Sequence, residues 1–573
     1  MRSNYSRIVA AVAVISMVSA LTACNETPTG TGPAGSAGPA GSAAGLADVS
    51  VGAMKDYKAD TTFKATEPMK FTVLYNDSPT YPYKADWLLW QKITELTNVT
   101  LDLTIVPLSD YQQKRSLLIG AGDAPMIIPK TYAGQETPFV ASGAVLPVSD
   151  YLDLMPNFEK KLKDWGLANE IDLLRQVNGK YYVLPGLHQE IWPDYTLAVR
   201  TDIFEKQGIA IPTTWDELKS ALQKLKAAYP SSIPFSDRYT GLSVLNIAAQ
   251  NFGTSAGWGL TSGLRFDKAA DKFVYAAAQP AYKQLLEYFN SLVKGGLMDP
   301  ESFTQQDDQA IQKFVTGKSF VISANSQDIV TYRKSMDTSL GAGKYSIKKI
   351  TVPAGPAGNI MAGTRLENGV MINASALKSK NFVAMMQFID WLYYSDQGEE
   401  FAKWGVKGTT YEKGADGVRK LAPDVNFQGL NPAGTKDLRV DYGFSGGVFA
   451  YGGTTDLLQS TMSPEEIEFQ KAMKAKTLEP FAPPAPLADA DREQATLLAT
   501  PLKDYADQAT LQFILGQRDL STFDAFVTEL EGKGMTKYTD MFNAAYKAFK
   551  TTAPSPSGSP SPSGSPSPSA SPK

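Results

Sequence analysis

The pattern of apolar and polar positions predicts a strand, a helix and a second strand early in the chain. Residues 71–75 form a short apolar run, residues 86–96 carry their apolar side chains on one helical face, and residues 101–106 alternate with a period of two. Such a unit pairs its strands in parallel through a right-handed crossover. Since residues 383–393 add a strongly apolar helix, we expect an α/β protein.

Helix-start signals recur further along the chain. Thr214 followed by Glu217 is the pattern of a capping box, in which each side chain bonds the backbone N–H of the other residue. Ser463 followed by Glu466 repeats it, with Pro464 at the first helical position. The chain after residue 463 is mostly helical in pattern, so the prediction includes a helical C-terminal region.

Both ends of the chain have a composition that cannot bury a core. Gly, Ala, Pro, Ser and Thr dominate residues 25–47, and the last twenty or so residues repeat Ser-Pro-Ser-Gly-Ser-Pro. We expect a flexible linker over 24–65 and a disordered tail over 550–573. The part between them is longer than one hydrophobic core usually serves, so we expect two or more domains.

The N-terminus has the layout of a secretory signal. Arg2 and Arg7 precede an apolar run over residues 8–20, and Leu-Thr-Ala-Cys closes it at Cys24. This tetrapeptide resembles the bacterial lipobox, whose cysteine is acylated. We therefore predict a signal peptide over 1–23, lipidation of Cys24, and anchoring by lipid to the outer face of the cell membrane. Cys24 is the only cysteine, so an intrachain disulfide is excluded.

The net charge and the small number of possible metal ligands exclude some classes of function. Loss of Arg2 and Arg7 with the signal peptide changes the formal net charge from -4 to about -6, and no basic run points to nucleic acid. A single histidine, His188, and a modified cysteine exclude the usual zinc sites. We expect no cofactor and no metal, although an all-oxygen calcium site is left open.

One motif suggests an enzyme. Residues 443–447 read Gly-Phe-Ser-Gly-Gly and fit the nucleophile-elbow pattern, which needs a later histidine. His188 precedes the motif, so we interpret it as a glycine-rich loop lining a ligand cleft and expect no enzyme. Two alternatives stay open: a secreted carbohydrate-active enzyme using paired carboxylates, and a cell-surface adhesin or structural lipoprotein, suggested by the two low-complexity ends.

Several motifs occur in a fixed order between Met69 and Glu412. They are Gly122-Asp123-Ala124-Pro125, Asn178-Gly179-Lys180-Tyr181-Tyr182-Val183-Leu184-Pro185, Phe314-Val315-Thr316-Gly317-Lys318-Ser319 and Trp391-Leu392-Tyr393-Tyr394-Ser395-Asp396-Gln397-Gly398. Together they resemble the extracellular solute-binding proteins of the maltose-binding type, the receptors of ABC importers, in their large Gram-positive lipoprotein branch. Met126 departs from the family pattern, which has Asp there.

The resemblance implies a fold and a function. The fold would be periplasmic-binding-protein-like of type II, with two α/β lobes, a hinge and a ligand cleft. Lobe one would comprise 66–187 plus 360–402, and lobe two 188–359 plus 403–549. The function would be that of a monomeric receptor that binds a small solute, expected to be an oligosaccharide, and delivers it by cleft closure to the permease subunits of an ABC importer.

Candidate ligand contacts follow from where strands end. Ligands of open α/β sheets lie beyond the carboxyl ends of the strands, and pockets favour domain interfaces. A sugar stacks on aromatic rings and pairs its hydroxyls with polar side chains. Loops that offer both predict twelve ligand-binding residues: Asn76, Asp77, Tyr81, Lys130, Tyr132, His188, Glu190, Trp192, Trp258, Asn325, Gln327 and Arg365.

Overall fold

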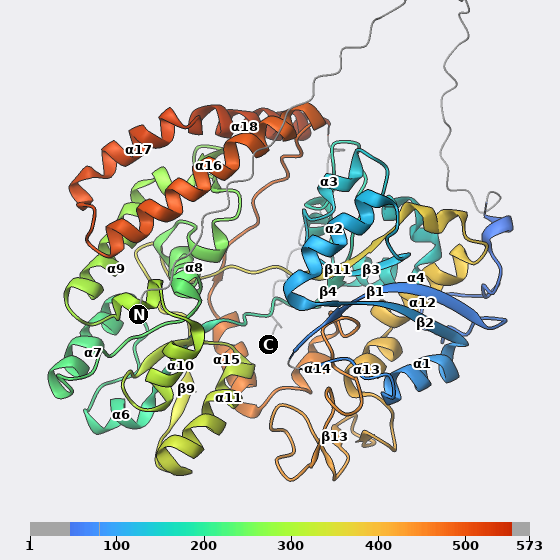
Figure 1. Ribbon diagram of the computed structural model, residues 1–573, viewed down its shortest axis with the longest axis horizontal. Coiled ribbons are helices and arrows are strands. Elements are labelled where there is room, and N and C mark those ends of the chain that lie inside the picture. Colours follow the sequence, from blue (N-terminus) through green and yellow to red (C-terminus); the bar gives the residue numbers. More distant parts are fainter. Residues whose placement is uncertain (1–45, 80, 553–573) are drawn as a thin grey trace, which may run out of the picture.

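Two lobes lie side by side in the computed structural model, which describes residues 46–79 and 81–552 (Figure 1). The predicted signal peptide, Cys24, the start of the linker and nearly all of the C-terminal tail lie outside the described residues. Within the described ranges, none of the helices combines the length and the apolar character needed to cross a membrane.

Lobe one is built on a five-stranded sheet. Its strands are β1 (Met69–Asp77), β2 (Val99–Pro107), β3 (Ile127–Thr131), β4 (Leu184–Leu187) and β11 (Leu366–Ile372), in the order β2-β1-β3-β11-β4. β1 pairs in parallel with β2 across α1 (Leu88–Thr97), which confirms the predicted strand–helix–strand unit. β11 runs antiparallel to β3 and β4, because the chain returns to this sheet from the other lobe.

The apolar helix α12 (Phe382–Tyr394) is buried along its whole length and forms the centre of the lobe-one core. It confirms the helix expected over 383–393. The other helices of this lobe are α2 (Tyr111–Ala121), α3 (Thr137–Val140), α4 (Pro156–Asp164), α5 (Ala168–Asp172) and α13 (Asp396–Trp404). Part of the predicted linker also packs here: Tyr57 Oη donates to Asp390 Oδ2 at 2.8 Å, and Phe63 is fully buried. Residues 46–65 are therefore part of the lobe, because their apolar side chains have a core to join.

Lobe two has a smaller antiparallel sheet. β5 (Thr196–Arg200) lies between β8 (Val321–Ala324) and β9 (Ile347–Lys349). The predicted capping box is present at α7, where Thr214 and Glu217 bond reciprocally. The remaining elements of this part are α6 (Thr201–Lys206), α7 (Trp215–Ala228), α8 (Leu242–Phe252), β6 (Leu264–Asp267), β7 (Lys272–Tyr275), α9 (Pro280–Lys294), α10 (Asp307–Val315), α11 (Ser326–Met336) and β10 (Ile360–Met361).

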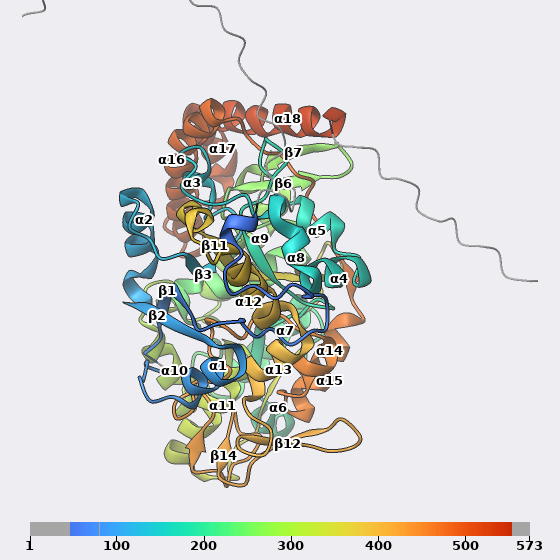
Figure 2. The same cartoon turned by 90° about the vertical axis from the view of Figure 1, so that its right-hand side faces the viewer.

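The C-terminal part confirms the predicted helical region. α14 (Thr455–Gln459) and α15 (Pro464–Lys474) lead through β16 (Thr477–Leu478) to α16 (Asp489–Ile514), α17 (Phe523–Gly532) and α18 (Met535–Thr552). The last three helices cover lobe two, as both views show (Figures 1 and 2). Phe513, Phe526 and Tyr538 belong to the same buried cluster as Phe289 of α9. Ser463 caps α15 by accepting the N–H of Glu466, as its sequence predicts.

The segment that follows α13 departs from the predicted division of the chain. It contains β12 (Tyr411–Lys413), β13 (Arg419–Leu421), β14 (Val425–Asn426) and β15 (Lys436–Asp437). The prediction assigned 403–549 to lobe two, but Phe427, Phe444 and Tyr451 are buried in the lobe-one core. Met361, predicted in lobe one, is buried in the lobe-two core. Residues 427–451 therefore belong to lobe one and Met361 to lobe two, because the three aromatic side chains and that of Met361 are buried in those cores.

We expect Phe444→Ala to lower the free energy of unfolding by about 3–5 kcal/mol, because it removes a buried ring and leaves a cavity. Phe444 is fully buried, and its ring centroid lies 5.4 Å from that of Phe401. Chemical denaturation measures the loss. Val418→Ala, at a side chain that is 51% exposed, should change stability by less than about 0.5 kcal/mol. A similar small effect at Phe444 would contradict its assignment to the lobe-one core.

Candidate ligand-binding site

Three segments cross between the lobes: residues 188–195, 362–365 and 452–463. They lie against one another, since His188 N donates to Arg365 O at 2.8 Å and Gly453 N donates to Leu187 O at 2.8 Å. Gly452 has φ 54°, and a Cβ there would lie 2.3 Å from Leu187 O. Only glycine permits this approach, so the three segments form one compact hinge.

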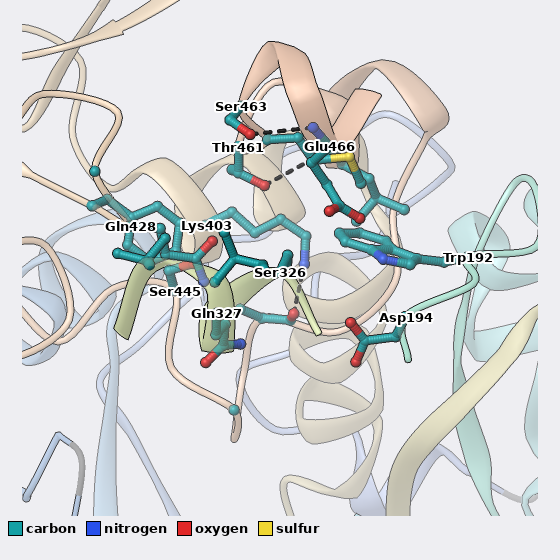
Figure 3. Close-up of a pocket in the computed structure, with 18 of the residues that line it drawn as sticks. Trp192, Asp194, Ser326, Gln327, Lys403, Gln428, Ser445, Thr461, Ser463 and Glu466 are labelled. Atoms are coloured by element: carbon teal, nitrogen blue, oxygen red, sulfur yellow. Dashed lines mark hydrogen bonds between the residues drawn. The ribbon is translucent and has the colours of Figure 1, made fainter. Parts of the chain in front are cut away.

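A cavity of about 860 Å³ lies beside the hinge, between the lobes. This is the size of a small-ligand site. Figure 3 shows Trp192, Asp194 and Glu466 on one side and Gln428, Lys403 and Ser445 on the other. Lobe one also contributes Gly446 and Gly447, which confirms that the Gly-Phe-Ser-Gly-Gly motif is a cleft-lining loop. The lobe-two wall includes Ser326, Gln327, Val330, Arg333 and Lys349.

Ion pairs neutralise the charges of the lobe-two wall. Lys349 Nζ lies 2.9 Å from Glu466 Oε2, and Arg333 Nη2 lies 2.6 Å from Glu465 Oε2. Burial raises the pKa of Asp194 to about 6, although the charge of Lys349 opposes the rise. Asp194 therefore offers the cavity a carboxyl that gains a proton in mildly acidic solution.

Glu367 connects the hinge to the lobe-one wall. Its Oε2 lies 2.9 Å from His188 Nε2 and accepts the N–H of Gly452 at 3.0 Å. Burial alone would raise the pKa of Glu367, but the hydrogen bond and charge of His188, with the charge of Lys403, lower it to about 2. Glu367 is thus an anion that is stabilised by His188, Lys403 and the N–H of Gly452. Lys403 Nζ in turn donates to Ala450 O at 2.5 Å, which positions the loop that lines the cavity.

Three of the predicted ligand contacts line the cavity: His188, Trp192 and Gln327. The half-buried indole of Trp192 meets the His188 ring edge-on, with centroids 6.0 Å apart. The cavity thereby has an aromatic surface beside polar groups. This combination suits a ligand with both apolar faces and hydroxyl groups.

Two further predicted residues lie directly behind the glycine-rich loop. Tyr81 Oη accepts the N–H of Gly447 at 3.1 Å. Lys130 donates its backbone N–H to Tyr451 Oη at 2.9 Å. Both touch the wall of the cavity from inside lobe one.

The structure gives the other predicted residues local contacts elsewhere. Trp258 packs with Tyr195 and Tyr239 at centroid distances of 5.1 and 4.9 Å. Arg365 donates to Glu170 Oε1 at 2.6 Å. Neither Trp258 nor Arg365 lines the cavity, and their role in ligand binding stays a prediction.

The remaining five predicted residues also lie outside the cavity, and their role in ligand binding stays a prediction. Asn76 is buried in β1, and Asp77 accepts a backbone N–H of the following loop. Tyr132 is 51% exposed, Glu190 pairs with a lysine of α15, and Asn325 caps α11. The strand-end rule thus selects some residues that line the cavity but does not separate them from helix caps and core groups.

Other cavity residues were not predicted, among them Asp194, Glu367, Lys403, Arg439 and Glu466. The strongest available signal was the helix start at Ser463, which places Glu466 in the first turn directly after a crossover. The part of the chain that the structure describes contains no group of three or more His, Cys, Asp or Glu side chains able to hold a metal ion.

Two α/β lobes joined by three crossovers, with a cavity between them, define the class of two-lobed binding receptors. Residues 78–399 match the model of the family described as bacterial extracellular solute-binding protein, and the chain belongs to this family. Membership confirms the resemblance seen in the sequence. It also makes the protein an extracellular solute receptor and not an enzyme, so the alternative of a carbohydrate-active enzyme is dropped.

Relatives cover most of the chain. It is 23% identical over 475 residues to the polygalacturonan/rhamnogalacturonan-binding protein YtcQ of Bacillus subtilis (strain 168), covering 80% of this chain and 88% of that protein. The alginate-binding protein AlgQ2 has the same fold, with a TM-score of 0.67, 18% identity and coverage of 86% and 100%. FusA, an ABC-transporter substrate binding protein of S. pneumoniae in complex with kestose, matches with a TM-score of 0.60 and 20% identity. The match covers 84% of this chain and 100% of FusA. These likenesses confirm the predicted fold.

We expect Glu367→Gln to lower the free energy of unfolding by roughly 1–2 kcal/mol at pH 7, because the variant loses the charge that His188 and Lys403 stabilise. The folded-state pKa of Glu367 lies below its ordinary value. Its stabilising effect is therefore complete above about pH 4.5 and is lost as the pH falls toward about 2.

Denaturant titrations between pH 7 and pH 3 measure this difference. The gap between the natural protein and the variant should shrink on the acid side. Glu67→Gln, at an exposed position, is the control and should leave the curve unchanged. A gap that is the same at every pH would contradict the role given to Glu367.

Proposed function

We propose that the protein is an oligosaccharide receptor of an ABC importer, tethered to the outer face of the cell membrane. The observation that carries this proposal is the cavity between the lobes, where the ring of Trp192 lies beside polar side chains from both walls. Sugars stack their apolar faces on such rings and pair their hydroxyls with such groups. A monomer suffices, because a single chain supplies both walls.

The relatives support the class of ligand. The names of YtcQ and AlgQ2 give polygalacturonan, rhamnogalacturonan and alginate, and FusA is described with kestose. The proposal therefore names oligosaccharides as a class and not one sugar. FusA is also described as an ABC-transporter substrate binding protein, which supports a permease as the partner of this chain.

Closure of the lobes is the proposed mechanism. A ligand that contacts Gln428 on lobe one and Gln327 on lobe two binds more tightly when both walls approach it, and this differential affinity favours the closed state. The compact hinge of three crossovers allows the lobes to move as units. Micromolar affinity corresponds to about -8 kcal/mol, which stacking on Trp192 and a few hydrogen bonds can supply. The permease would recognise the closed form.

We expect Trp192→Ala to weaken glycan binding at least tenfold, since it removes the indole ring on which a sugar face can stack. A thermal-shift screen of mono- and oligosaccharides identifies the ligand, and calorimetric titration then measures the loss. Trp90→Ala is the matched control, because Trp90 is equally half-buried but lies in α1, outside the cavity.

The same ligand should also compact the protein in small-angle scattering. An unchanged scattering curve at saturating ligand would contradict closure. Stabilisation by no member of the panel would favour the remaining alternative, an adhesin or structural lipoprotein, because a receptor becomes more stable as the concentration of its ligand rises.

The tether rests on Cys24. We expect Cys24→Ser to release the protein from the membrane into the medium, because no acyl chain can then be attached. Fractionation of cells followed by immunoblotting measures the shift, with a serine substitution of neighbouring Thr22 as the control. Glycan affinity should be unchanged in the released protein. Retention at the membrane in spite of the substitution would contradict the lipid anchor.

A further inference from the structure

The lobe-one wall of the cavity holds a cation that forms no ion pair with any described residue. The Arg439 guanidinium lies over the ring of Tyr81, 5.3 Å from its centroid, and over the ring of Phe427 at 5.0 Å. Within residues 46–79 and 81–552 it forms no ion pair and donates no side-chain hydrogen bond. Arg333 and Lys349, on the opposite wall, each have a glutamate within 2.9 Å.

A guanidinium in this position keeps its charge. Burial lowers the pKa of Arg439, and Tyr81 and Asp437 oppose the shift. Because arginine is not deprotonated in proteins, the site holds a partly desolvated positive charge. Such a charge costs free energy unless an anion pairs with it.

A second unpaired cation lies close by. Lys130 has φ 55°, which is unusual for a residue with a side chain. Two bonds hold this conformation: its N–H donates to Tyr451 Oη at 2.9 Å, and its carbonyl accepts from Arg115 Nη1 at 3.0 Å. Its ammonium lies 5.9 Å from the Tyr451 ring centroid and makes no ion pair with any described residue.

Gly447 lies in close contact with both Tyr81 and Lys130. A Cβ at this position would lie 2.8 Å from Tyr81 Oη and 3.1 Å from Lys130 Nζ. Gly447 does not have a positive φ, so the missing side chain permits this close approach and is not needed for backbone freedom. Tyr81 Oη already accepts the N–H of Gly447, which leaves the phenolic hydrogen free to be donated.

We propose that Tyr81, Lys130 and Arg439 form a cationic subsite that binds a carboxylate of the ligand, so that the receptor takes acidic, uronate-containing oligosaccharides. This inference rests on the proposed function and names its substrate class. The paired N–H groups of a guanidinium match the two oxygens of a carboxylate. Stacking on Tyr81 and Phe427 holds the guanidinium plane in place before the ligand arrives. A neutral sugar would leave the charge unpaired.

The test compares one glycan with and without its charge. The full chain carrying Cys24→Ser is titrated calorimetrically with oligogalacturonate, with alginate oligosaccharides, and with the methyl ester and carboxyl-reduced forms of each. At least one acidic glycan should bind tenfold or more tightly than its neutral form. Arg439→Gln should abolish this preference, because the acidic form loses the charge that pairs with its carboxylate. Lys84→Gln, which removes an exposed charge of the same lobe outside the cavity, should change neither affinity by more than about twofold.

Gly447→Ala provides a second variant in case Arg439→Gln does not fold, and it should also reduce the preference for the acidic form. Equal affinity for acidic and neutral forms would overturn the subsite and leave the proposed function standing. Equal losses in Lys84→Gln and Arg439→Gln would overturn it as well, since net charge alone would then explain the effect. A sulfated glycan without uronate residues that binds as tightly as the uronate would overturn the assignment to a carboxylate. If no glycan binds, the proposed function fails together with the subsite.

Discussion

The arrangement of the two lobes depends on the carboxylate of Glu367, which bonds two of the hinge segments to each other. Glu367 begins the return of the chain into lobe one and bonds His188 of the first crossover and Gly452 of the third. Behind it, Lys403 lies between the charges of Glu367 and Glu399, and Lys161 pairs with Glu399 at 2.7 Å. Alternating charges therefore extend from the back of lobe one to the cavity. A largely buried series of this kind tolerates few alternative arrangements, because any displaced member would leave a charge without a partner.

Local sequence predicted the regular elements well, because their signals are local. The parallel pair of β1 and β2, the buried helix α12 and the cap at Thr214 each depend on a few neighbouring residues. Residues 411–451 were placed in the wrong lobe for the opposite reason. Their strands are two or three residues long, too short to show a period, and the partners of Phe427 and Phe444 are distant in sequence. Nothing local records which of two cores an aromatic residue will join.

The residues of the site also divide into those that local sequence could predict and those that it could not. His188, Trp192 and Gln327 were predicted because they follow strands, and the structure places them on the cavity. Arg365 and Asn325 occupy equivalent positions but bond to their own lobe. Arg439 was missed because it comes from an irregular loop after β15, where no periodic pattern points to a cleft. Its role depends on its position in space: the guanidinium lies over two aromatic rings and forms no ion pair with any described residue.

The odd number of crossovers has a topological consequence. A chain that starts in one lobe and crosses three times must end in the other, and residues 46–65 do pack on lobe one while α18 packs on lobe two. The two ends of the described chain are therefore carried by different bodies. The distance between these two ends depends on how far the lobes are open. Tension applied to the two ends would therefore act directly on the angle between the lobes.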